Sequence, residues 1–125
     1  MGRQASHLRR VFAVWDVARV AFPFADSPIH RNRPALVIST PDVHERFGVL
    51  WVLMITSAER TRWPGDVTIS DLAEAGLPVP CVVRTEKIAT IDTRFAEPAG
   101  RLSEQDRPDV VWSLRRLLDS VLVMS

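Results

Sequence analysis

The chain alternates between short apolar runs and polar turns, and the spacing within those runs predicts a mainly β fold. Residues 14–22 alternate apolar and polar side chains, as a half-buried strand does. Residues 34–40 form a continuous run rich in β-branched side chains, which is typical of a strand buried on both faces. Residues 49–55 are the most apolar stretch and are expected to be the central strand. Further short strands are predicted at 66–69, 81–84, 87–91 and 101–102.

Helix signals interrupt this pattern in three places. A turn or short helix is expected to begin at Pro41 and to end at Gly48. Asp71 is a candidate N-cap with Glu74 three residues later, so one or two helical turns should end at Gly76.

A longer C-terminal helix is predicted over 103–122, starting from a capping serine. Pro108 lacks a backbone donor, so this helix either begins nearer Asp106 or has a loose first turn. Its apolar stripe has helical spacing and is expected to be part of the core; the stripe consists of Val110, Val111, Leu114, Leu117, Leu118 and Val121.

Size and composition favour one compact domain over residues 1–125, with residues 1–12 as an N-terminal arm or short helix. An apolar fraction of 46% is enough for a core. Many short strands followed by one strong helix predict a small, strongly curved antiparallel barrel. No signal core and no run of the ~20 apolar residues needed to span a bilayer are present, so a cytoplasmic protein without membrane contact is expected. The single cysteine, Cys81, fits a reducing compartment.

The formal net charge is only +1, so any nucleic-acid contact must come from local clusters of basic residues. Three such clusters occur, namely Arg31 with Arg33, Arg60 with Arg62, and Arg84 with Lys87. Arg33 precedes Pro34, which biases it towards an extended backbone and holds its guanidinium at a loop–strand junction. That placement suits phosphate recognition by paired hydrogen bonds.

Metal and nucleotide cofactors are not expected. His7, His30 and His44 share no ligand spacing with each other or with Cys81. The glycines are scattered, and no phosphate-binding loop is present. RNA cleavage needs neither group, because the 2′-hydroxyl of RNA is its own nucleophile once a base removes the proton.

An ordered set of motifs resembles the MazF/PemK family, the growth-inhibiting toxins of bacterial toxin–antitoxin pairs. The blocks are FPFAD (22–26), RPALVIS (33–39), ITSA (55–58), RWPGDV (62–67), GLP (76–78), VVR (82–84) and ATID (89–92). The resemblance implies an SH3-like curved barrel of the MazF/CcdB type and a metal-independent, sequence-selective endoribonuclease acting on single-stranded RNA. It also implies products with 2′,3′-cyclic phosphate ends, a homodimer, and a cognate antitoxin whose disordered segment folds into the RNA groove.

The resemblance assigns catalytic roles to four residues. Arg33 matches the arginine that acts on the scissile phosphate, and Thr56 matches the threonine that positions it. Arg84 and Glu86 lie where some members place an arginine and an acid that move protons. Further RNA contacts are expected from Asp16, Ser57, Arg31, Arg62, Trp63 and Lys87.

Structural alternatives accompany these assignments. Arg33 could instead brace its loop through a salt bridge to Asp26 or Asp16, and Glu86 could be a solvated strand residue. Trp63 is either a base-stacking platform or a loop anchor. Cys81 is interpreted as a buried, unreactive thiol.

Two departures bear on the resemblance, Trp15 before the first strand and Pro108 in the C-terminal helix. Trp15 occupies the position where the family usually has a glycine before the acidic Asp16, so the entry into the first strand should differ. His30 falls in a loop where some members carry a histidine that stabilises the transition state. Two other functions therefore stay open: a CcdB-like toxin that binds a protein such as DNA gyrase, and an inactive binding module.

Overall fold

A computed structural model describes residues 11–22 and 31–123. His30 and most of the expected N-terminal arm lie outside these residues. The elements in chain order are β1 (Asp16–Phe22), β2 (Arg31–Val37), α2 (Pro41–Phe47), β3 (Val49–Ser57), β4 (Asp66–Thr68), α3 (Leu72–Ala75), β5 (Cys81–Asp92), η1 (Thr93–Phe95), β6 (Ala96–Arg101), η2 (Glu104–Asp106) and α4 (Arg107–Val123).

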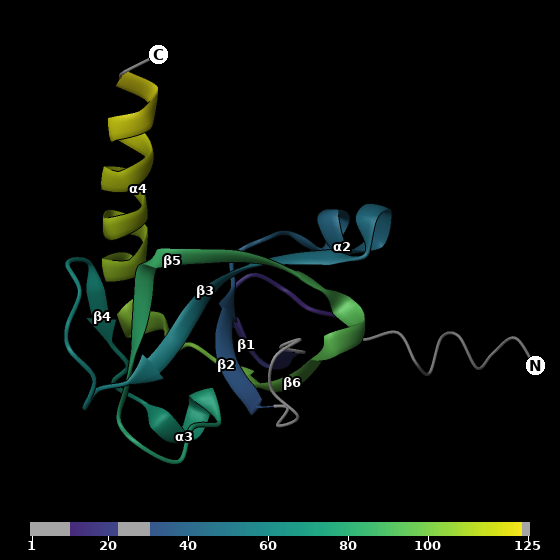
Figure 1. Cartoon of the computed structure of the whole chain (residues 1–125), viewed down its shortest axis with the longest axis horizontal. Helices are drawn as coiled ribbons and strands as arrows, with labels where there is room; N and C mark the ends of the chain where they lie inside the picture. The colour runs from purple at the N-terminus through teal and green to yellow at the C-terminus, as the bar shows by residue number, and fades with distance from the viewer. Residues whose placement is uncertain (1–10, 23–30, 124–125) are drawn as a thin grey trace, which may run out of the picture.

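The strands form one six-stranded antiparallel sheet in the order β4-β5-β3-β2-β1-β6. The sheet curls around its core, and α4 projects from one end of it (Figure 1). This confirms the predicted curved antiparallel fold with a C-terminal helix and places β3 inside the sheet. In the described chain the edges β4 and β6 are not paired with each other, so the barrel is open. No described helix is long and apolar enough to cross a membrane.

Alternating side chains send the strands' apolar residues to two buried clusters, one on each face of the sheet. Val17, Leu36 and Leu53 belong to one cluster, while Ala18 and Val20 belong to the other. All five side chains are fully buried. The period of two along β1 therefore fixes which residues can reach solvent at the strand ends.

The short helices begin and end where the capping signals predict. The Asp71 carboxylate accepts a hydrogen bond from the Glu74 N–H (2.9 Å), and α3 ends at Gly76 with a φ of 73°. Gly48 ends α2 in the same left-handed conformation. Gly76 has a second constraint, because a Cβ there would lie 2.1 Å from the Ala99 carbonyl oxygen of β6.

Three predicted strand boundaries need correction. The run expected at 34–40 forms β2 over Arg31–Val37, and beyond the strand the Ser39 hydroxyl accepts from the Trp51 N–H and bonds to His44. The two strands expected at 81–84 and 87–91 are one strand, β5, whose pairing with β3 is irregular. The strand expected at 101–102 is the end of β6, which runs over Ala96–Arg101.

The C-terminal α-helix starts at Arg107, which confirms the predicted alternative of a start nearer Asp106. Pro108 then lies in its first turn, where a missing donor is tolerated.

The expectation that the α4 stripe is core is wrong for its C-terminal part, whereas Leu114 packs against the core. Val110 is fully buried, but Leu118 is 54% exposed and Val121 is 64% exposed. Figure 1 shows the reason, since only the first turns of α4 lie against the sheet and the rest extends beyond it. The single chain therefore presents an uncovered apolar helix face.

Trp15 has a φ of 80°, the only positive value of a non-glycine residue in the described chain. Its N–H donates to the Val37 carbonyl (2.9 Å), and its carbonyl accepts from the Leu102 N–H (2.9 Å). The side chain packs against the core cluster that contains Val17, beside the Arg107 guanidinium. The chain thus keeps a conformation that suits glycine while adding a large apolar side chain.

Candidate functional site

A pocket of about 570 Å³ lies between the middle of β1, the start of β2, the end of β3 and the segment after α3. β2 contributes Arg33 and Pro34 to the lining, and β3 contributes its last two residues, Thr56 and Ser57. The remaining described lining residues are Arg19, Asn32, Ile55, Arg60, Gly76, Leu77, Pro78, Val79, Cys81 and Ala99.

The strand register explains why Arg33 and Thr56 meet. Ala35 of β2 is paired with Met54 of β3, and both side chains belong to the same buried cluster. Two residues further along each strand, Arg33 and Thr56 continue this row on the same face of the sheet. Residues 23 positions apart in the sequence are thus cross-strand neighbours at the sheet's end.

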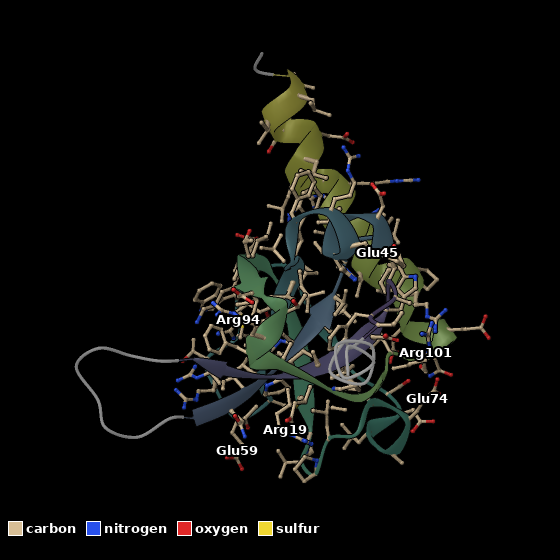
Figure 2. The ribbon with its side chains drawn as sticks, turned by 90° about the vertical axis from the view of Figure 1, so that its right-hand side faces the viewer. Arg19, Glu45, Glu59, Glu74, Arg94 and Arg101 are labelled. Atoms are coloured by element: carbon tan, nitrogen blue, oxygen red, sulfur yellow. The ribbon has the colours of Figure 1, made fainter. Side chains whose placement is uncertain are left out.

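The described lining of the pocket is positively charged. Its described lining contains three arginines, Arg19, Arg33 and Arg60, and no carboxylate. These arginines come from β1, β2 and the loop after β3. The fold thus gathers positive charge in one place, although the net charge of the whole chain is only +1. Figure 2 shows Arg19 and Glu59 at the end of the molecule opposite the free end of α4.

Sequence reasoning missed Arg19 and did not include Arg60 among the site residues. Arg19 is a polar residue within the alternation of β1, which indicated an outward side chain but not which cavity it would reach. Asn32 and the wall formed by residues 77–79 were missed for the same reason, since long-range pairing alone brings them to the pocket.

Asp16 lies outside this pocket and stabilises the start of β1. Its carboxylate binds the Arg101 guanidinium and accepts a hydrogen bond from the Ala13 N–H (2.8 Å). The salt bridge considered between Arg33 and Asp16 is therefore replaced by one between Arg101 and Asp16.

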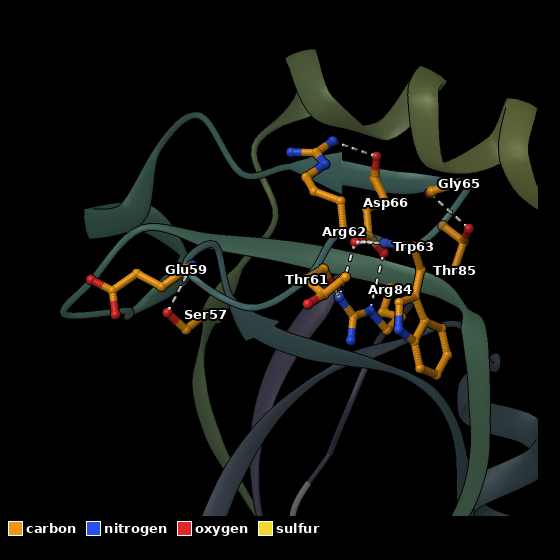
Figure 3. A network of polar contacts seen from close by, with 9 residues as sticks. All are labelled: Ser57, Glu59, Thr61, Arg62, Trp63, Gly65, Asp66, Arg84 and Thr85. Carbon is orange, nitrogen blue, oxygen red and sulfur yellow. Dashed lines mark hydrogen bonds and ion pairs between the residues drawn. The ribbon is translucent and has the colours of Figure 1, made fainter.

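Arg84 is also absent from the pocket lining and is buried, with its side chain 9% exposed. Its Nε and Nη2 donate to the two Asp66 carboxylate oxygens at 3.2 and 3.1 Å, and Nη2 also donates to the Thr61 carbonyl at 2.7 Å (Figure 3). The guanidinium lies 4.3 Å from the centre of the Trp63 ring. Arg84 therefore joins the loop after β3 to β5.

Asp66 is the acceptor at the centre of this network. It also accepts the Trp63 N–H at 2.8 Å, and its side chain is fully buried. Burial alone would raise the pKa of Asp66, but the hydrogen bonds from Arg84 and the Trp63 N–H outweigh it and lower that pKa below the ordinary value. The Asp66 carboxyl is thus ionised at neutral pH.

The other predicted contacts surround this network. Ser57 lines the pocket, and its hydroxyl accepts from the Glu59 N–H (3.3 Å). Arg62 is exposed and donates to the Asp66 carbonyl (3.3 Å). Glu86 and Lys87 are exposed on the irregular part of β5, outside the pocket lining. The Arg31 side chain lies outside what the structure describes.

Cys81 lines the pocket from β5 but is 5% exposed. Burial raises the pKa of its thiol, which disfavours the nucleophilic thiolate. The described residues also contain no group of three or more His, Cys, Asp or Glu side chains placed to hold a metal ion. The chemistry available in the pocket is therefore that of guanidinium groups and hydroxyls.

Residues 13–118 match the family model described as PemK-like, MazF-like toxin of type II toxin–antitoxin system. Comparison with curated protein sequences found no significant match. Among solved structures, a MazE–MazF complex from Deinococcus radiodurans has a chain 24% identical with a TM-score of 0.69, over 88% of this chain and 97% of that one.

Two mycobacterial structures share the fold at lower identity. Mycobacterium tuberculosis toxin MazF-mt6 is 22% identical with a TM-score of 0.63, over 82% of this chain and 95% of that one. An endoribonuclease in complex with its cognate antitoxin, from a mycobacterial species, is 12% identical with a TM-score of 0.67, over 89% of this chain and 96% of that one.

Proposed function

Since this chain belongs to the PemK-like, MazF-like family of toxins of type II toxin–antitoxin systems, we propose that it is a metal-independent endoribonuclease that cleaves single-stranded RNA. The observation that carries the proposal is the pocket lined by Arg33 and Thr56 together with Arg19 and Arg60, with no carboxylate among its described lining residues. A pocket of this charge suits a phosphodiester.

The reaction we propose is an internal transfer at phosphorus. The 2′-oxygen loses its proton and attacks the adjacent phosphorus, which forms a 2′,3′-cyclic phosphate while the bond to the 5′-oxygen breaks. The 5′-oxygen leaves with a proton as a hydroxyl. Negative charge grows on the phosphoryl oxygens during attack, so a positioned guanidinium stabilises the transition state more than the ground state.

We assign Arg33 and Thr56 to binding of the scissile phosphate. The Arg33 guanidinium is the charged group that stabilises the phosphoryl oxygens, and the Thr56 hydroxyl donates to one of them and fixes its orientation. Pro34 holds the Arg33 backbone extended, so little ordering is needed when RNA binds.

For proton transfer, we propose Glu86 as the base, the role that the family resemblance assigns to it; its side chain is exposed on β5. Arg84 is given no proton-transfer step, because its guanidinium is engaged with Asp66 and Thr61.

The test is incubation of the purified protein with a long single-stranded RNA in EDTA, followed by mapping of fragment ends. Arg33→Ala should lower the cleavage rate by about 10²–10³-fold, as loss of one charge-stabilising group does. Arg46→Ala is the matched control, because Arg46 is an exposed arginine of α2. Intact RNA with the parent protein would move the weight to a CcdB-like toxin or an inactive module.

Two partners complete the proposal. We propose a cognate antitoxin whose acidic segment occupies the arginine-lined pocket, by analogy with the antitoxin complexes among the structures of the same fold. We also propose a homodimer, because the exposed apolar face of α4 needs a cover that the single chain does not provide.

A further inference from the structure

The loop after β3 contains a tryptophan with two different faces. One face of the Trp63 ring lies on the buried Arg84 guanidinium, at 4.3 Å from the ring centre to the guanidinium carbon. The residue nevertheless remains 42% exposed. Figure 3 shows the ring beside Arg84 at the outer side of the network. A loop anchor buried for packing alone would not keep this much indole surface in water.

The backbone that carries this ring is held by two hydrogen bonds. The Trp63 backbone N–H donates to the Asp66 carboxylate (2.8 Å), and the Asp66 backbone N–H donates back to the Trp63 carbonyl (3.1 Å). Arg84 is in turn held by both Asp66 oxygens and by the Thr61 carbonyl. The loop backbone and the guanidinium beneath the indole are therefore held in place before any ligand arrives, which lowers the ordering entropy that a stacking base would cost.

The register places this ring next to the candidate site. Met54 of β3 is paired with Arg84 of β5, and Arg84 is paired with Asp66 of β4. Thr56 stands two residues beyond Met54 on the same face, so it is a diagonal neighbour of Arg84, about 7–8 Å away. A nucleotide whose phosphate contacts Thr56 therefore has Trp63 within reach of its own base or of the adjacent base.

We propose that the exposed face of Trp63 is a stacking subsite for one unpaired base of the RNA, and that Arg84 is a positioning residue that holds this platform. The inference rests on the proposed function. Any base has a π-face, so the platform contributes affinity with little base preference.

The test is RNA affinity, measured with a short single-stranded RNA that spans a mapped cleavage site and carries 2′-deoxyribose at the scissile nucleotide. Trp63→Ala should weaken binding by about 5- to 150-fold, as loss of one base–aromatic stack does. Trp63→Phe should retain most of the affinity. Trp51→Ala is the control, because Trp51 is a tryptophan of β3 that is 50% exposed, somewhat more than Trp63.

Two readouts separate stacking from a general loss of structure. Removing single bases from the RNA should identify one position whose loss weakens the parent protein but has no further effect on Trp63→Ala. The salt dependence of binding should keep its slope in Trp63→Ala, because no phosphate contact is lost. If every single-base removal changes the RNA affinity of the parent protein and of Trp63→Ala by the same factor, the proposed subsite is wrong.

The positioning role of Arg84 is tested separately, by steady-state kinetics. The double variant Asp66→Asn with Arg84→Met removes both charges of the pair, and it should raise KM more than it lowers kcat while leaving the pH profile of kcat unchanged. A shifted pH profile would instead make Arg84 a proton-transfer residue. If the parent protein neither binds nor cleaves RNA, the proposed function fails; if it cleaves RNA and Trp63→Ala binds as tightly, this inference alone fails.

Discussion

Trp15 combines a large apolar side chain with a backbone conformation that favours glycine. Comparing Trp15→Gly with Trp15→Ala separates the two, because both variants lose the indole. A left-handed conformation costs an alanine about 1–2 kcal/mol, whereas glycine usually costs about 0.5–1 kcal/mol more than alanine in flexibility. We expect Trp15→Gly to be the more stable variant by about 0.5–1 kcal/mol in urea unfolding. The opposite order would mean that the strand entry relaxes when the side chain is removed.

His44 links stability to pH. It is buried, 9% exposed, with its Nε2 2.9 Å from the Ser39 hydroxyl and its ring edge against Phe12. Burial lowers the pKa of His44 below its ordinary value of 6.5, and it does so against the opposing effect of backbone carbonyls. The unfolded chain then binds the proton more tightly, so the stabilising contribution is present above pH 6.5 and is lost as the pH falls towards the lower folded pKa.

This predicts that the free energy of unfolding falls as the pH is lowered below 6.5. His44→Gln removes the titrating group and should flatten the decline in denaturant titrations at several pH values. An equally steep decline in His44→Gln would assign the acid sensitivity to another group.

At the scale of elements, the Arg84–Asp66 pair joins the loop after β3 to β5 from a buried position. Removing one partner leaves the other charge buried and unpaired, which costs about 3–5 kcal/mol. We expect Arg84→Met to lose that amount in thermal or urea unfolding, and the double variant with Asp66→Asn to recover most of it. Recovery is the decisive result, because a purely steric role of Arg84 would leave the double variant as unstable as the single one.

Element ends that depend on local chemistry could be predicted from the sequence, and those that depend on distant pairing could not. Asp71 and Gly76 bound α3 as expected, because a cap needs only residues a few positions away. β5 is continuous because it pairs with β3 and β4. From the sequence alone, its central residues are therefore predicted as a break between two strands. The same limit applied to the site: the family motifs identified Arg33 and Thr56, whereas the pocket position of Arg19 follows from sheet pairing alone.

At the scale of the whole molecule, α4 shows why periodicity did not identify what covers an apolar face. The stripe has helical spacing, yet only its first turns are buried within the chain, and a helix face buried by a second chain has the same pattern. Beyond its first turns α4 projects from the sheet (Figure 1), and the apolar side chains of Leu118 and Val121 on that part are exposed.

The dimer prediction follows from this face. Leu118→Asp places a charge in the exposed part of the stripe, where a second copy would have to desolvate it, so this variant should be monomeric. Ser120 is exposed on the opposite side of the same turn, which makes Ser120→Asp a control of equal charge change that should stay dimeric. Light scattering coupled to size exclusion, at matched concentrations, measures both. A Leu118→Asp protein that remains dimeric would show that the subunits meet elsewhere, and the apolar face of α4 would then need a different occupant.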